Sequence, residues 1–197
     1  GGGKWRNSIL VSALITGIAA VHYLYMRDAY SSMGADAVTA FRYVDWILTV
    51  PLMCVEFYLI LAKAGATKKL MWQLIFLSTV MLVTGYVGEA GHGSAQIWGS
   101  ISGAAYFVLA YILWFGNPQE LANKAGGAVL DAYTALKWFV LVGWSIYPIG
   151  YMAGTEGWYS DIFSGLSGQM DLIYNIGDAV NKIGFGLVIY NLAVSSK

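Results

Sequence analysis

A lysine lies inside an apolar stretch of the chain, where a charged side chain is costly. Lys182 stands near the middle of residues 170–194, MDLIYNIGDAVNKIGFGLVIYNLAV, which are long enough to cross a bilayer as a helix. Asp178 lies one helical turn earlier, on nearly the same face. Charged residues in the middle of membrane helices are rare and usually functional. A desolvated lysine can form a Schiff base with an aldehyde, and a buried structural ion pair is the alternative for this segment alone.

A second apolar stretch carries three charged residues. Residues 41–61 read FRYVDWILTVPLMCVEFYLIL. On a helical wheel Asp45 shares one face with Arg42, Thr49 and Glu56, because successive residues turn by about 100°. Carboxylates on an interior face of a membrane helix are typical of proton relays. The alternative is that these residues only hold helices together, but a stacked set opposite a helix with Lys182 favours the relay.

The charges suggest two different tasks for the two acids. A protonated Schiff base on Lys182 would need an anion, and Asp45 and Asp178 can supply it. Glu56 lies roughly 16 Å beyond Asp45 along the helix axis and has mainly apolar neighbours. A buried carboxyl group with no cation beside it is expected to keep its proton. One acid is therefore expected to accept a proton and the other to donate one.

The elements that must position these residues are membrane helices. The chain has 197 residues, of which 58% are hydrophobic and only 11% are charged, whereas soluble domains carry about twice that charged fraction. The apolar residues fall in long runs without polar alternation, which argues against a membrane barrel. We expect one all-α membrane domain over residues 4–197, preceded by a linker or tag remnant at residues 1–3. Its predicted helices cover about residues 8–26, 40–61, 70–87, 97–114, 128–154 and 170–194.

The distribution of charge predicts the orientation in the membrane. An even number of spans puts both termini on one side, and basic residues collect there: Lys4, Arg6, Lys63, Lys68, Lys69, Lys124 and Lys197. The positive-inside rule makes that side cytoplasmic, so Glu56 would lie nearer the cytoplasm than Asp45. No basic cluster indicates a nucleic-acid partner. The single Cys54 lies within a span, which excludes an intrachain disulfide and indicates a packing residue.

The sequence resembles the microbial rhodopsins, and the green-absorbing proteorhodopsin branch in particular. The matching stretches are FRYVDWILTVPLMCVEFYLIL, GYVGEAG, GWSIYPIGY and DLIYNIGDAVNKIGFGL, and the resemblance extends over nearly the whole chain from Lys4 onward. It implies a seven-helix bundle, of which this chain would begin at the second helix. It also implies a light-driven outward proton pump, an ion transporter rather than an enzyme. The pump would lie in the bacterial inner membrane as a homo-oligomer of five or six subunits, with no metal.

The resemblance assigns a role to each candidate residue. All-trans retinal would be bound covalently to Lys182 through a protonated Schiff base. The residues expected to handle protons are Asp45 as acceptor, Thr49 beside it, Glu56 as donor, Asp178 as second counterion, His22 coupled to Asp45, and Arg42 with Glu89 on the release path. Those expected to form the retinal pocket are Trp46 and Trp144 on its two faces, with Tyr147, Pro148, Met81, Gly85 and Tyr174. An apolar residue at Met53 implies green absorption.

Two alternatives remain open at this point. Gly99 stands where many members of the family carry a bulky aromatic residue, and a glycine near this place opens a window for a carotenoid antenna in some relatives. The other interpretation of Gly99 is ordinary close packing of helices. The second functional class is a sensory photoreceptor that signals through a partner, and Glu56 argues against it because a sensor needs no fast internal proton donor. The triads of the family's sodium and chloride pumps differ from the one found here.

Overall fold

The protein is a bundle of long helices. The computed structural model describes residues 3–196, and of residues 35–37 only the backbone. Within this part there is no strand, and six helical segments are long and apolar enough to cross a membrane, so the all-helical prediction is confirmed. The long helices are α1 (Arg6–Met33), α2 (Ala35–Leu61), α3 (Lys68–Glu89), α4 (Ala95–Phe115) and α9 (Met170–Ser195), with α6 (Gly127–Leu141) and α7 (Ile146–Gly154) sharing one crossing.

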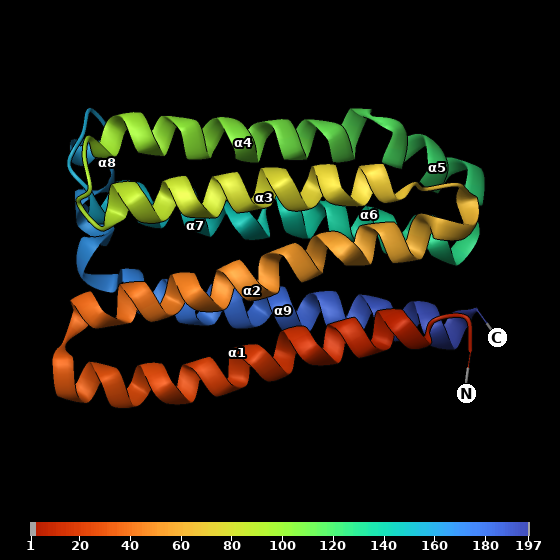
Figure 1. Ribbon diagram of the computed structural model, residues 1–197, viewed down its shortest axis with the longest axis horizontal. Helices are drawn as coiled ribbons and strands as arrows, with labels where there is room; N and C mark the ends of the chain where they lie inside the picture. Colours follow the sequence, from red (N-terminus) through yellow and green to blue (C-terminus); the bar gives the residue numbers. More distant parts are fainter. Residues whose placement is uncertain (1–2, 197) are drawn as a thin grey trace.

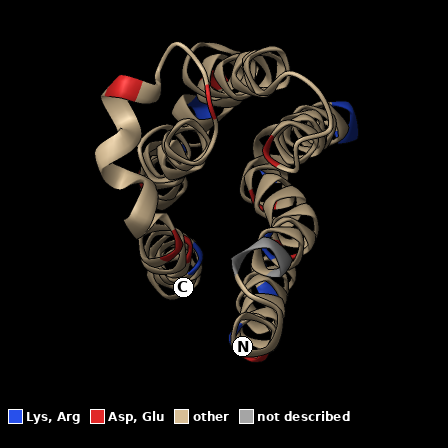
Figure 2. Cartoon of the chain, turned by 90° about the vertical axis from the view of Figure 1, so that its left-hand side faces the viewer, with Lys and Arg blue, Asp and Glu red and all other residues tan. Residues whose placement is uncertain are grey.

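The helices lie lengthwise beside one another, with both chain ends at the same end of the bundle (Figure 1). Each of α1, α2, α3 and α4 packs against the next, and α9 contacts α6, α7 and α1. The first and last helices also contact each other, and the view along the helices shows them arranged in an arc whose two arms carry the chain ends (Figure 2). This arrangement brings α9, which carries Lys182, next to α1 and opposite α2.

Local sequence signals set several helix ends. Thr67 and Ser94 accept hydrogen bonds from the backbone N–H groups of Leu70 and Ile97, and so cap the starts of α3 and α4. Gly34 has a φ of 83°, a conformation that other residues rarely adopt, and it ends α1 where α2 begins. As a result α1 continues beyond the predicted limit at Met26 to Met33.

The fifth crossing is broken where sequence analysis predicted one continuous helix. Between α6 and α7 a short 3-10 segment runs from Gly143 to Ser145, because Pro148 has no N–H to donate to the carbonyl group of Trp144. The carbonyl groups near the break find other donors. The Asn181 amide donates to Gly143 O at 2.8 Å, and the Tyr106 hydroxyl donates to Leu141 O at 2.5 Å. Both carbonyl groups therefore have a hydrogen-bond donor despite the break. Trp144 and Tyr147 lie beside this break.

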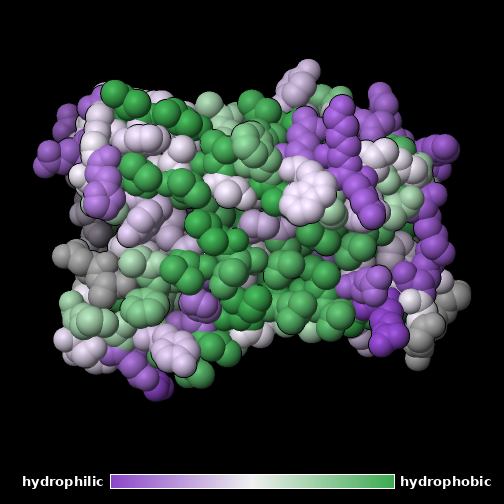
Figure 3. Space-filling model, viewed as in Figure 1, coloured by the Kyte–Doolittle hydropathy of each residue, from purple (hydrophilic) through white to green (hydrophobic). Residues whose placement is uncertain are grey.

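The surface has the layout of a membrane protein. On the face seen in Figure 3, hydrophobic residues cover the middle of the bundle and hydrophilic residues gather towards its two ends. The large apolar side chains of Phe76, Phe107 and Leu187 are more than half exposed, as expected of residues that face lipid. A short helix, α5 (Asn117–Ala125), joins α4 to α6 at the end where the termini lie. Of the predicted basic residues at this end, Lys197 lies outside the described residues.

Candidate functional site

The buried lysine is held between two carboxylates from different helices. Lys182 Nζ lies 2.5 Å from Asp45 Oδ2 of α2 and 2.5 Å from Asp178 Oδ2 of α9. All three side chains are at most 2% exposed. One positive and two negative charges thus share a site without contact to solvent, where every charge needs partners. The helix-face argument placed these residues near one another, and the structure brings them into direct contact.

The two carboxylates differ in their other partners. Asp178 accepts a hydrogen bond from the Tyr23 hydroxyl at 2.8 Å and another from the Tyr147 hydroxyl at 3.1 Å. In contrast, Asp45 Oδ1 is buried without a hydrogen-bond partner in the described part of the chain. The Thr49 hydroxyl does not reach this carboxylate, because it donates to the backbone oxygen of Asp45 at 2.9 Å. Asp178 is therefore the better stabilised of the two anions.

Two residues on α1 face this centre, and sequence analysis predicted only one of them. His22 is half-buried, and its Nδ1 has no hydrogen-bond partner among the described residues, so no hydrogen bond joins it to Asp45. The neighbouring Tyr23, which was not predicted, is the residue that contacts the ion pair. Its only signal in the sequence is a tyrosine next to the candidate histidine within an apolar run.

Glu56 lies apart from this centre, towards the end of the bundle where the termini meet. It is fully buried, and its Oε1 accepts a hydrogen bond of 2.7 Å from the Ser12 hydroxyl. Its other oxygen, Oε2, has no partner in the described part of the chain. The helix between Glu56 and Asp45 presents the fully buried apolar side chains of Val50 and Met53. No ion pair joins Glu56 to a cation in the described part of the chain, so nothing there compensates for the burial of a negative charge.

Arg42 extends the site in the opposite direction. Its side chain is almost completely buried and binds Asp171 Oδ1 at 3.0 Å and Asn175 Oδ1 at 3.3 Å. The guanidinium group also lies over the ring of Tyr174, 4.8 Å from its centre. Although Arg42 and Asp45 share a helix face, Arg42 is paired with Asp171, whose side chain is about half exposed. Sequence analysis did not identify Asp171 or Asn175 as site residues.

Glu89 has a separate partner. At the end of α3 it accepts a hydrogen bond of 2.6 Å from the Tyr43 hydroxyl. The Tyr43 ring in turn meets the Trp46 ring edge-on, with centroids 5.0 Å apart. The Tyr43–Glu89 pair therefore connects the aromatic interior with the end of the bundle that lies away from the termini.

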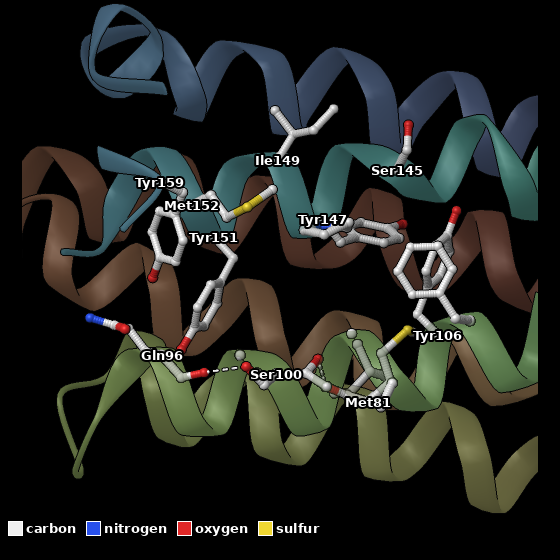
Figure 4. A pocket seen from close by; sticks show the side chains of 18 of the residues that line it. Met81, Gln96, Ser100, Tyr106, Ser145, Tyr147, Ile149, Tyr151, Met152 and Tyr159 are labelled. Atoms are coloured by element: carbon white, nitrogen blue, oxygen red, sulfur yellow. Dashed lines mark hydrogen bonds between the residues drawn. The ribbon is translucent and has the colours of Figure 1, made fainter. Parts of the chain in front are cut away.

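A cavity of about 630 Å³ lies between α3, α4 and α7 (Figure 4). Its volume falls within the roughly 300–1,000 Å³ of small-molecule sites. Six predicted pocket residues line it: Trp46, Met81, Gly85, Gly99, Tyr147 and Pro148. Four other residues predicted to bind the cofactor are not part of its lining: Met53, Trp144, Tyr174 and Lys182. The aromatic and apolar lining suits a long, flat, apolar ligand.

The cavity and the ion pair meet at two aromatic rings. Trp46 and Tyr147 line the cavity, with ring centroids 4.6 Å apart, and Tyr147 also donates to Asp178. A ligand that extends from Lys182 Nζ into the cavity therefore requires these two rings to move apart. The indole N–H groups of Trp46 and Trp144 are buried without partners in the described part of the chain, so few hydrogen bonds oppose such a movement.

Two glycines shape the cavity wall. A Cβ atom on Gly85 would lie 3.2 Å from the Tyr43 hydroxyl and 3.3 Å from the Ser102 hydroxyl, so a larger residue would crowd both groups. A Cβ atom on Gly99 would lie 3.1 Å from Cζ of Tyr151. The Tyr151 ring reaches from α7 towards α4 in Figure 4, where its hydroxyl donates to Ala95 O at 2.5 Å. Gly99 thus permits close packing of α4 against α7.

Known proteins resemble this chain in sequence over nearly its whole length. A sequence profile described as "Bacteriorhodopsin-like protein" matches residues 2–196. The green-light absorbing proteorhodopsin of Gamma-proteobacterium EBAC31A08 is 46% identical over 192 residues, covering 97% of this chain and 75% of the relative. The blue-light absorbing proteorhodopsin of Gamma-proteobacterium Hot 75m4 is 45% identical over 196 residues, with the same coverage. The chain thus spans about three quarters of the length of these curated relatives.

Solved structures show the same similarity. The crystal structure of Exiguobacterium sibiricum rhodopsin has a TM-score of 0.83 and 32% sequence identity, covering 99% of this chain and 85% of that one. Xanthorhodopsin, described as a light-driven ion pump with dual chromophore, has a TM-score of 0.77 and 30% identity, covering 99% and 82%.

Proposed function

We propose that the chain, which belongs to the bacteriorhodopsin-like family and is similar to the green-light absorbing proteorhodopsins, is a light-driven outward proton pump. The observation that carries this proposal is the buried Lys182 between Asp45 and Asp178, with the fully buried Glu56 farther along the helix of Asp45. A structural ion pair alone would not require the second buried acid. The similarity to rhodopsin pumps supports a transporter that crosses a bacterial membrane several times.

The chromophore that we propose is all-trans retinal, joined covalently to Lys182. When bound, retinal would absorb visible light and, by changing shape, displace the proton held at Lys182 Nζ. Trp46, Tyr147, Pro148, Met81 and Gly85 would hold its apolar chain in the cavity. The rigid aromatic walls would orient the chain, and their burial would keep water away from Nζ. We further infer that Met53 favours green absorption, as the apolar residue at that position.

Asp45 is the proton acceptor in this proposal. Asp178 already receives two tyrosine hydrogen bonds, which stabilise its negative charge, whereas Asp45 Oδ1 receives none. Hydrogen bonds to a charged group are worth about 1.5–3 kcal/mol each. A proton that leaves Nζ is therefore bound more favourably by Asp45 than by Asp178. The roles of Asp178 as second counterion and of His22 as a partner of Asp45 belong to the same proposal.

Glu56 returns a proton to Lys182 Nζ from the other side. The apolar residues between Glu56 and the ion pair separate the two acids in the resting state, which prevents the released proton from flowing back. Arg42 with Asp171, and Tyr43 with Glu89, would form the release path. The positive-inside rule makes the end with the termini cytoplasmic, so this order of transfers moves protons outward across the inner membrane. Assembly into a pentamer or hexamer remains a prediction from family resemblance.

A carotenoid antenna beside Gly99 is a second, more specific candidate function. The cavity continues past Gly99 to Phe107 and Trp158, which are 67% and 76% exposed and so face the membrane side. The close approach of Tyr151 to Gly99 favours packing instead. If a carotenoid binds, incubation with hydroxylated carotenoids should add their bands to the action spectrum of the wild type, and Gly99→Trp should remove them. No added bands in the wild type would leave Gly99 as a packing residue.

The attachment of the chromophore tests the proposal at the site. We expect the purified protein to gain a visible absorption band on addition of all-trans retinal, with the adduct found on Lys182 by mass spectrometry. Lys182→Ala should gain neither. Lys137→Ala is a matched control, because Lys137 is also buried but binds Gln119 and lies over the Trp114 ring. An adduct on another residue would refute the assignment. Light-driven acidification by intact cells tests transport and separates a pump from a sensor.

A further inference from the structure

Two serines lie between Glu56 and the end of the bundle where the termini meet. Ser8 and Ser12 are one turn apart on α1, are 2% and 8% exposed, and are the only buried polar residues of this helix in the described part of the chain. The Ser12 hydroxyl donates to Glu56 Oε1 at 2.7 Å. Ser8 lies one turn nearer the start of α1 on the same buried face. Both serines therefore face Glu56 from the side of the basic chain end.

The other buried side chains of α2 and α9 at this end of the bundle are apolar. On α2, Ile60 lies one turn beyond Glu56 on the same face and is 2% exposed, and Leu61 beside it is fully buried. Leu192 of α9 is 2% exposed at the same end of the bundle. Burial of a hydroxyl group in such surroundings costs free energy that an alanine would not incur. For Ser12 the hydrogen bond to Glu56 offsets this cost.

Ser8 and Ser12 lie between Glu56 and the end of the bundle that carries the basic residues. Trp5 lies one turn before Ser8, is 7% exposed, and has the Lys4 ammonium group 4.8 Å from its ring centre. A serine hydroxyl both donates and accepts hydrogen bonds, so it can bind a proton on its oxygen while it releases its own. Among the described residues, the other buried side chains of α1 are apolar and cannot exchange a proton.

We propose that Ser8 and Ser12 form the path by which a proton from the cytoplasmic surface restores Glu56 after each transfer. Ser12 holds the carboxyl group through Oε1, and Ser8 delivers the incoming proton, which ends on the unpartnered Oε2. Glu56 changes from carboxylate to carboxylic acid, and each serine ends with the same number of protons as before. This inference rests on the proposed role of Glu56 as donor, but it concerns a separate step.

Hydrogen exchange in the dark tests the path without any light-driven step. The full chain in lipid vesicles is transferred to D₂O, and the C=O stretch of the Glu56 carboxyl group, identified by its loss in Glu56→Gln, is followed by infrared spectroscopy. We expect Ser8→Ala to slow the exchange on the order of tenfold, less than the roughly 10²–10⁴-fold of a positioned acid or base. Ser8→Thr should restore the rate. Thr16→Val is the matched control, because the Thr16 hydroxyl bonds only to the backbone of its own helix.

The light-driven cycle gives a second readout. After a flash, Ser8→Ala should delay the recovery of the Glu56 proton by the same factor and leave the rate of its loss unchanged. Unchanged exchange and recovery in Ser8→Ala would overturn the proposal, and Ser8→Cys serves the same purpose if the alanine variant does not fold. If instead Glu56→Gln fails to slow the return of a proton to Lys182, the donor role of Glu56 is wrong, whatever the serines do.

Discussion

The two aspartates beside Lys182 are equal in type and in distance but not in surroundings. Each has an oxygen 2.5 Å from Nζ. Asp178 is also bound by two tyrosine hydroxyls, one from α1 and one from α7, whereas Asp45 Oδ1 has no hydrogen-bond partner among the described residues. In the proposed pump this difference makes Asp178 the permanent anion and Asp45 the proton acceptor. Tyr23 and Tyr147 would then contribute to the direction of transfer although neither carries a charge.

Replacement of the acceptor tests this assignment. We expect Asp45→Asn to shift the visible absorption band to the red, because the positive charge at Lys182 Nζ loses one of its two anions. Pumping should be lost, since the amide cannot accept the proton. The measurements are the absorption spectrum of the purified variant and the pH of an illuminated cell suspension. An unchanged colour together with normal acidification would refute the role of Asp45.

Removal of one tyrosine hydroxyl tests the role of Asp178. Tyr23→Phe keeps the ring but takes one hydrogen bond from the buried carboxylate, which should destabilise the protein by about 1.5–3 kcal/mol. We expect faster thermal loss of the visible band and a slower net transfer, because Asp178 then competes better for the proton. Tyr25→Phe is the control, since Tyr25 is 62% exposed on the same helix. Equal thermal stability of the two variants would show that the Tyr23 hydrogen bond contributes little.

At the scale of elements, the broken crossing is the feature that sequence analysis missed. The apolar run predicted one helix over residues 128–154. Hydrophobicity indicates that a segment lies in the membrane, but it does not show whether the helix is continuous. The structure divides it at Gly143–Ser145, where Pro148 removes a hydrogen bond and Asn181 of α9 supplies another. A Cβ atom on Gly143 would collide with the Asn181 side chain. Proline marks such a break, but the residue that compensates it belongs to a distant part of the chain.

Asn181 should therefore be needed for the geometry around Trp144. Asn181→Leu leaves the Gly143 carbonyl group without its donor, and an unsatisfied buried acceptor costs about 1–3 kcal/mol. We expect a lower temperature for thermal loss of the visible band and a shifted absorption maximum. The exposed Asn191, nearly three turns farther along the same helix, provides the control Asn191→Leu. If both variants match the wild type, another group satisfies the Gly143 carbonyl.

The sequence alone predicted which face of the helix over residues 41–61 is buried. The wheel of residues 41–61 placed Asp45, Thr49 and Glu56 towards the interior, and all three are at most 1% exposed. The same periodicity does not say which residues of other helices meet that face. Ser12, Tyr23 and Asp171 went unnoticed for this reason, because each contacts its partner across a helix interface that only the folded bundle defines.

At the scale of the whole molecule, the interior of the helix bundle contains two polar regions, one towards each end. Glu56 and its serines lie towards the end with the termini, and Arg42, Asp171 and Glu89 lie towards the other end. Lys182 lies between them, and buried apolar and aromatic side chains fill the levels above and below it. A single central group that exchanges protons with both regions in turn is what an outward pump requires. The proposed direction follows from the basic residues at one end of the bundle, which the positive-inside rule places in the cytoplasm.

Light-driven proton movement by intact cells is the most direct test of the central claim. Cells that produce the protein are supplied with all-trans retinal and illuminated in weakly buffered medium while the external pH is recorded. We expect the medium to become more acidic in the light, the change to disappear with a protonophore, and Lys182→Ala and Asp45→Asn to give no signal. A wild-type protein that carries retinal on Lys182 but leaves the external pH unchanged, or raises it, would contradict outward proton pumping.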